Sequence, residues 1–208
     1  MNAVRHAIAD EVLAAARAHD AAQSDRLARF RNVEPETAEL LGVLVRAARA
    51  RRVLELGTSN GYSTLWLADA VEATGGALTS VEIDPARTAM ARANLDRAGL
   101  AAELVTGDAG EVLRASADGA WDLVFLDAER PAYAGYWPEL LRTLRPDGGL
   151  LAIDNVLSHA AEVAEVTTSI EAEPAVTSAL VPVGAGVRLV VRAARATGRA
   201  GVMRRHRS

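Results

Sequence analysis

Short apolar segments alternate with helical segments through the middle of the chain, and this alternation limits the fold more than any other feature. The apolar segments are residues 53–56, 77–81, 103–106, 121–126 and 150–153, and the helical patterns between them are residues 62–73, 85–98, 110–117 and 133–144. Such alternation is typical of a parallel sheet with helices on both faces. Two later segments, 176–183 and 187–191, are joined by a glycine-rich turn that indicates a hairpin. We therefore expect an α/β fold with a mostly parallel seven-stranded sheet and an antiparallel C-terminal strand.

The regions before and after this pattern carry different signals. Residues 3–31 are rich in alanine and place Val4, Ile8 and Val12 on one helical face, and a second helix begins near Pro35. We expect residues 1–50 to form a helical cap on a single domain that comprises residues 1–194. Residues 195–208 are basic and poor in apolar side chains, which predicts a disordered tail, with an arm that touches RNA or a membrane as the alternative.

Composition excludes several classes of protein and mechanism. The net charge of -4 and the pI of about 5.6 argue against a nucleic-acid partner. No apolar run approaches the roughly 20 residues that cross a bilayer, and no export signal is visible, so we expect a cytoplasmic protein that does not enter a membrane. The chain has no Cys, and all 23 basic residues are Arg, which excludes thiolate metal sites and every mechanism that needs a lysine.

Two apolar segments each end in an aspartate. Residues 121–126 run into Asp127, and residues 150–153 run into Asp154 and Asn155. Because the carboxyl ends of parallel strands meet at one edge of a sheet, we expect these side chains to share a crevice. Two carboxylates and an amide oxygen suit a hard divalent cation such as Mg²⁺, Mn²⁺ or Ca²⁺. A helix N-cap stays open as the alternative for Asp127 considered by itself.

A glycine turn follows the first apolar segment. Its glycines, Gly57 and Gly61, lie four residues apart, so the turn lacks the spacing of a dinucleotide site, and a purely structural turn stays open. Glu55, just before the turn, would repel a pyrophosphate and attract a cationic ligand. Glu82 ends the second segment, where an acid commonly binds the hydroxyls of a ribose. The pattern favours adenosine with a positively charged group over NAD.

Four motifs occur in order along the chain, at residues 53–68, 81–84, 122–130 and 144–157. Together they resemble the motifs of class I S-adenosylmethionine-dependent methyltransferases, specifically the cation-dependent O-methyltransferases related to catechol and caffeoyl-CoA O-methyltransferases. The resemblance implies a Rossmann-like fold, methylation of a hydroxyl on a small aromatic, catechol-like diol, and a homodimer.

The resemblance also implies roles for individual residues. The methionine part of the cofactor would lie near Glu55, Gly57, Thr58, Gly61 and Asp127, with Ser63 at its carboxylate, Glu82 at the ribose, and Asp108 and Ala109 at the adenine. Asp127, Asp154 and Asn155 would be the metal ligands, with Mg²⁺ the first choice, and Asp127 would also be a catalytic residue.

The chain departs from the family pattern at Arg130. The family has a lysine base there, and an arginine does not release its proton at neutral pH. Arg130 is either a fixed cation that stabilises the substrate oxyanion or an ordinary surface arginine. His159 is a second candidate for the proton acceptor. The alternatives to an active O-methyltransferase are a family member that binds the cofactor but catalyses weakly and, further away, a nicotinamide-dependent oxidoreductase.

Overall fold

A seven-stranded sheet forms the centre of the computed structural model, which describes residues 1–194; the predicted disordered tail, 195–208, lies outside the described residues. The strand order is β3-β2-β1-β4-β5-β7-β6. The strands are β1 (Arg52–Leu56), β2 (Ala77–Glu82), β3 (Glu103–Thr106), β4 (Leu123–Leu126), β5 (Leu150–Ile153), β6 (Val176–Val181) and β7 (Val187–Arg192). The first five strands are parallel, and β7 is antiparallel to both β5 and β6. The predicted fold class is therefore confirmed.

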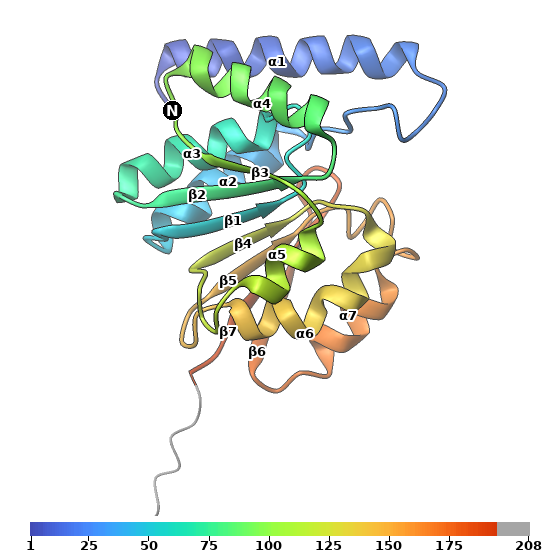
Figure 1. Ribbon diagram of the computed structural model, residues 1–208. Helices are drawn as coiled ribbons and strands as arrows, with labels where there is room; N and C mark the ends of the chain where they lie inside the picture. Colours follow the sequence, from blue (N-terminus) through green and yellow to red (C-terminus); the bar gives the residue numbers. More distant parts are fainter. Residues whose placement is uncertain (195–208) are drawn as a thin grey trace, which may run out of the picture.

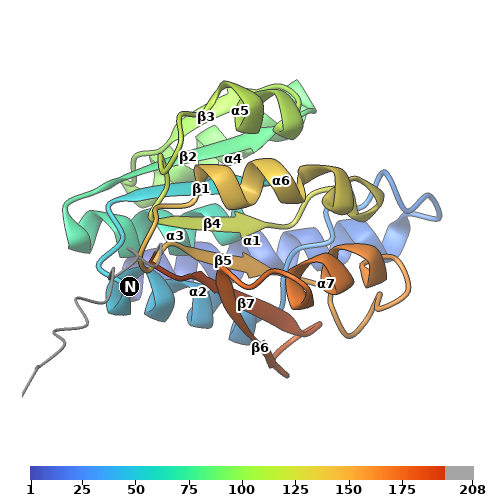
Figure 2. The same cartoon turned by 90° about the horizontal axis from the view of Figure 1, so that it is seen from below.

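Helices cover both faces of the sheet, as Figures 1 and 2 show. One face carries α2 (Pro35–Ala47), α3 (Tyr62–Thr74) and α4 (Pro85–Ala98), and the other carries α5 (Ala109–Ala115), α6 (Tyr133–Thr143) and α7 (Ala164–Glu171). A short 3₁₀ turn, Arg130–Ala132, leads into α6. The longest helix, α1 (Ala3–Ala22), packs outside the sheet layers against α3 and α4. None of the helices in residues 1–194 combines the length and apolar character that a bilayer span requires.

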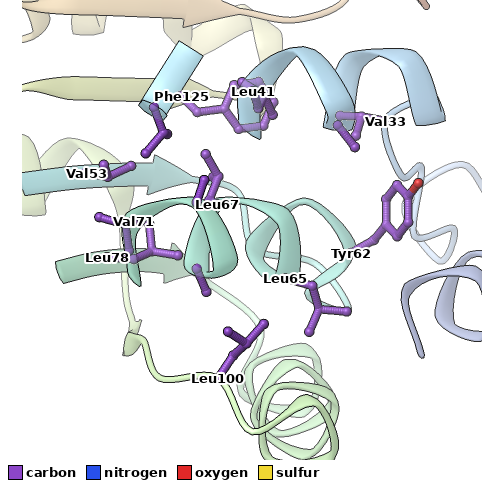
Figure 3. Close-up of a cluster of buried hydrophobic side chains, with 14 of the residues drawn as sticks. Val33, Leu41, Val53, Tyr62, Leu65, Leu67, Val71, Leu78, Leu100 and Phe125 are labelled. Atoms are coloured by element: carbon purple, nitrogen blue, oxygen red, sulfur yellow. The ribbon is translucent and has the colours of Figure 1, made fainter. Parts of the chain in front are cut away.

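Two apolar clusters, one on each face, hold these layers together. The first joins the sheet to α1, α2, α3 and α4, and its members include Leu41, Tyr62 and Phe125, all 2% exposed or less (Figure 3). The second joins the sheet to α5, α6 and α7 through residues such as Tyr133 and Leu140. Burial of each apolar side chain of this size stabilises the fold by about 1.5–3 kcal/mol, so the two clusters hold the strands and helices in fixed positions.

The helix α1 ends at Ala22, and the prediction that it continues to residue 31 is wrong. The carboxylate of Asp20 turns the chain, because its two oxygens accept the backbone N–H groups of Phe30 and Arg31 at 2.7 and 2.9 Å. Arg31 has a φ of 54°, which a right-handed α-helix does not accommodate. Residues 23–34 form a loop, here called the α1–α2 loop, that lies at the edge of the sheet toward which the strand arrows point (Figure 1).

Candidate active site

The two strand-end aspartates lie side by side. Leu126 of β4 pairs with Ile153 of β5, so the following residues, Asp127 and Asp154, leave the sheet at the same level. Asn155 has a φ of 67°, a conformation that Asn adopts more readily than most residues. This backbone brings its amide nitrogen within 2.9 Å of Asp127 Oδ1 and 3.3 Å of Asp154 Oδ2. The structure thus brings together the three side chains that the sequence assigned to a metal.

The electrostatics of this group fit a cation. Burial, and then the neighbouring charge of Asp154, raises the pKa of Asp127 well above its ordinary value. Burial also raises the pKa of Asp154, to about 6. In the described part of the chain, the buried Oδ1 atom of Asp154 has no hydrogen-bond partner. A divalent cation would neutralise both acids, and a half-turn of the Asn155 amide would direct its oxygen to the same point.

The N-cap alternative for Asp127 is wrong. The 3₁₀ turn that follows starts at Arg130, and the residue before it is Glu129. The backbone N–H of Asp127 instead bonds to the carbonyl of Leu56, which continues the parallel ladder with β1. The side chain of Asp127 is therefore available to line the crevice.

A cavity of about 380 Å³ opens over these side chains. One wall comes from the strand ends, with Asp127, Asp154 and Asn155, and the opposite wall comes from the α1–α2 loop. Arg130, Ser158 and His159 also line it, together with Ala128 and Ala185. We call this space the acid cavity.

A second cavity, of about 370 Å³, lies beside the first at the ends of β1, β2 and β3. Five of the nine residues that the sequence assigned to the cofactor line it, namely Gly57, Glu82, Asp108, Ala109 and Asp127. We call this space the nucleotide cavity. The two cavities have Arg31, Asp127 and Ala128 in common, so ligands in them would meet at this point.

Glu82 is held rigidly at the rim of the nucleotide cavity. One carboxylate oxygen accepts the N–H of Ser59 at 2.8 Å, and the other accepts the N–H of Asp84 at 3.0 Å. Each oxygen keeps a lone pair for a further donor. Leu27 and Ile83 line the same cavity and are 59% and 71% exposed, which provides apolar walls for a flat ring.

Gly57 is required where the nucleotide cavity meets β4. Its φ is +106°, and a Cβ atom would lie 2.1 Å from the carbonyl oxygen of Asp127. Only glycine permits this approach of the first turn to the strand-end acid.

Four other predicted cofactor residues lie below the cavity floor. Glu55 is fully buried, and its carboxylate accepts hydrogen bonds from Ser63 at 2.5 Å and from Thr64 and Ser80 at 2.6 Å. Burial raises the pKa of Glu55 to about 7, although the hydroxyl donors oppose the shift. Thr58 joins this network through Ser80, and Gly61 packs against Ala91 of α4. In the described part of the chain, Glu55, Thr58, Gly61 and Ser63 line neither the acid cavity nor the nucleotide cavity.

Arg130 is buried, at 4% exposure, so the alternative of an ordinary surface arginine is wrong. Its Nε donates to Glu162 at 2.9 Å. Within residues 1–194, no hydrogen bond engages its two terminal nitrogens. His159 is half-buried in the same lining, with Nδ1 2.8 Å from the hydroxyl of Ser158. The three predicted catalytic residues, Asp127, Arg130 and His159, therefore all border the acid cavity.

The α1–α2 loop is the part of the site that the sequence did not predict. It contributes Arg26, Arg29, Phe30, Arg31 and Asn32 to the acid cavity. The available signal was the end of the apolar periodicity after Ala22, followed by arginines at short intervals. That signal marks a loop but does not indicate where the loop folds back.

A family model described as O-methyltransferase matches residues 6–193. The chain belongs to this O-methyltransferase family. The match confirms the class of enzyme that the motifs predicted, an S-adenosylmethionine-dependent O-methyltransferase, and leaves no support for the nicotinamide-dependent alternative.

Named relatives and solved structures agree with this assignment. A catechol O-methyltransferase of Mycobacterium tuberculosis is 40% identical over 159 residues, which cover 75% of this chain and 70% of the relative. A catechol O-methyltransferase of Niastella koreensis is 38% identical over 153 residues, which cover 71% of this chain and 66% of the relative. The crystal structure of an O-methyltransferase from Bacillus cereus in complex with SAH has a TM-score of 0.75 and 26% identity, and the match covers 89% of this chain and 90% of that one.

Proposed function

We propose that this O-methyltransferase transfers the methyl group of S-adenosylmethionine to one hydroxyl of a small catechol-like diol, with a divalent cation at the strand-end acids. Two relatives are named catechol O-methyltransferases, and the similar Bacillus cereus enzyme is in complex with SAH, the demethylated cofactor. These names support the cofactor and the phenolic class of substrate. The cation rests on the chemistry of this chain's own residues.

The observation that carries the proposal is the shared border of the two cavities. The nucleotide cavity and the acid cavity have Arg31, Asp127 and Ala128 in common. A methyl donor in one and a hydroxyl in the other would therefore lie next to each other. Positioning two reactants in this way supplies much of the rate enhancement of a direct displacement.

The nucleotide cavity suits an adenosine group. Glu82 has free lone pairs for ribose hydroxyls, while Leu27 and Ile83 offer apolar cover for the adenine beside Asp108 and Ala109. When bound, S-adenosylmethionine supplies a methyl group on a positively charged sulfur. Asp127, at the border, provides negative charge that stabilises this sulfonium.

Asp127, Asp154 and Asn155 would hold the cation. Mg²⁺ prefers hard oxygen ligands, and the carboxylates of Asp127 and Asp154 provide them, including the Oδ1 atom of Asp154 that has no hydrogen-bond partner in the described part of the chain. When bound, the cation supplies a Lewis acid that lowers the pKa of a substrate hydroxyl.

Arg130 and His159 divide the remaining tasks in this proposal. Arg130 keeps its proton and stabilises negative charge on the substrate oxygen from a buried position. His159 accepts the hydroxyl proton, directly or through a water, since its ring lines the acid cavity. The homodimer that the resemblance implies stays a prediction.

The test is a methyl-transfer assay over a panel of phenols and vicinal diols, with and without Mg²⁺, accompanied by calorimetry with S-adenosylhomocysteine. We expect binding of S-adenosylhomocysteine and Mg²⁺-stimulated methylation of diols but not of single phenols. Cofactor binding with no turnover on any diol would instead support the weakly catalytic alternative. Activity that is indifferent to chelator would remove the cation from the proposal.

A further inference from the structure

The acid cavity has an excess of hydrogen-bond donors on its loop wall. Three arginines of the loop, Arg26, Arg29 and Arg31, line the cavity, and Arg130 lines it from the 3₁₀ turn before α6. Arg26 and Arg31 share a single acid, Glu129, at 3.4 and 2.6 Å, and Arg130 pairs with Glu162. Asp127 and Asp154 line the opposite wall, and the lining acid of the loop, Glu34, pairs with Arg17 at 2.9 Å. A substrate must therefore match a cationic wall as well as the strand-end acids.

Arg29 carries the least compensated charge of the four. Its Nε and Nη2 donate to the backbone carbonyl of Gln23 at 3.0 and 2.7 Å, which holds the guanidinium in one orientation. Within residues 1–194, no carboxylate lies within ion-pair distance of Arg29. A fixed arginine without an acid is pre-organised for an anionic group of a ligand.

Two further donors of the loop lack partners. The Nε of Arg31 and the Nδ2 of Asn32 are buried, and neither has a hydrogen-bond partner in the described part of the chain. Both residues line the acid cavity. Buried donors without partners are rare because each costs about 1–3 kcal/mol, so a ligand rich in acceptor oxygens is the natural partner.

We propose that the α1–α2 loop selects diols that carry a carboxylate, and that Arg29 and Asn32 bind this carboxylate while the diol faces the strand-end acids. This inference rests on the proposed function and names its substrate class. The two walls differ in sign, so a molecule with hydroxyls at one end and a carboxylate at the other enters in one orientation. A cavity of about 380 Å³ lies at the small end of ligand sites, which favours a single-ring acid over an acyl-CoA.

Steady-state kinetics with three matched compounds test the inference: dihydroxybenzoate, catechol and dihydroxybenzylamine, each with vicinal hydroxyls. For the unaltered enzyme with Mg²⁺, we expect kcat/KM to fall in this order. Arg29→Gln and Asn32→Ala should each raise the KM for dihydroxybenzoate about tenfold and change the KM for catechol less than twofold. The control Arg92→Gln removes an exposed arginine of α4 that lines neither cavity, and its kinetics should match those of the unaltered enzyme.

Calorimetry separates this inference from the proposed function. Dihydroxybenzoate is titrated into the protein with Mg²⁺ and S-adenosylhomocysteine, where no turnover occurs, and Arg29→Gln should weaken its binding about tenfold. Equal affinity for dihydroxybenzoate and catechol, or an equal loss of both in Arg29→Gln, would overturn the inference while diol methylation stands. Preference for a caffeoyl-CoA thioester over free caffeate would also overturn it. Absence of methylation on every diol, with intact dihydroxybenzoate binding, would instead reject the proposed function.

Discussion

The amide nitrogen of Asn155 lies 2.9 Å from Oδ1 of Asp127 and 3.3 Å from Oδ2 of Asp154, so this amide bridges the two strand-end acids. We expect Asp154→Ala to reduce Mg²⁺-stimulated methyl transfer at least about tenfold, because it removes a ligand whose Oδ1 has no partner within residues 1–194. Binding of S-adenosylhomocysteine, measured by calorimetry, should be unchanged because Asp154 does not line the nucleotide cavity. Asp118→Ala, which removes an exposed acid, is the matched control.

Arg130 should act as a fixed cation. Arg130→Gln is expected to lower kcat about tenfold with little change in the KM for S-adenosylmethionine, because Arg130 lines only the acid cavity of the two. Arg130→Lys introduces the base that the family resemblance implies, and it should change the dependence of kcat on pH by adding a second proton acceptor beside His159. An identical pH–rate profile for the arginine and lysine enzymes would show that this position does not exchange a proton.

Asp20 should act on the site by positioning the α1–α2 loop. Asp20→Ala removes the acceptor for the N–H groups of Phe30 and Arg31, and it should raise the KM for both cofactor and diol several-fold because Arg31 borders both cavities. Asp20→Asn retains one oxygen acceptor and should recover part of the loss. Asp10→Ala, on the exposed side of α1, should leave both KM values unchanged.

Glu55 should make the metal-free protein less stable as pH rises. Its pKa is about 7 in the folded protein against an ordinary value of 4.5, so the folded state holds a proton that the unfolded state releases. Glu55 contributes about 3 kcal/mol to the free energy of unfolding below pH 4.5, and this contribution is lost as the pH rises to about 7. Denaturant titrations in EDTA across this range should show the fall, and Glu55→Gln should make it smaller, with the remainder coming from Asp127 and Asp154, whose pKa values burial also raises. A slope that is the same in both proteins would contradict this assignment.

Gly57 and Gly135 should respond in opposite directions to alanine. Gly57→Ala places a Cβ atom 2.1 Å from a backbone oxygen at a φ of +106°, so we expect a loss of about 3 kcal/mol in the free energy of unfolding. Gly135 lies within α6 with open space around it, so Gly135→Ala should stabilise the protein by about 0.5–1 kcal/mol. Chemical denaturation of the two variants measures both values.

The sequence predicted the sheet and the strand-end acids because both follow from local patterns. Apolar segments of fixed length and their terminal acids define where Asp127 and Asp154 leave the sheet, and parallel pairing brings them together. The loop conformation of residues 23–34 depends on Asp20, whose carboxylate accepts hydrogen bonds from residues ten and eleven positions ahead. Helical periodicity does not detect such a bond, so the loop wall of the acid cavity was missed.

The burial of Arg130 illustrates the same limit. Its substitution for lysine is visible in the sequence, but its ion pair with Glu162 spans 32 residues and a turn. The position of Glu55 was also predicted, while its three hydroxyl partners come from α3 and β2 and meet only in the folded chain. Residue identity at a motif was thus readable, and the contacts that decide its role were not.

The shared position of the α1–α2 loop constrains how this enzyme can diverge. Arg31 lines both cavities, so a change in the loop that admits a new substrate to the acid cavity also alters the nucleotide cavity, where the methyl donor would bind. New substrate ranges should arise more easily through Arg29 and Asn32, which line the acid cavity but not its neighbour. Libraries directed at those two positions would broaden substrate choice while preserving cofactor affinity.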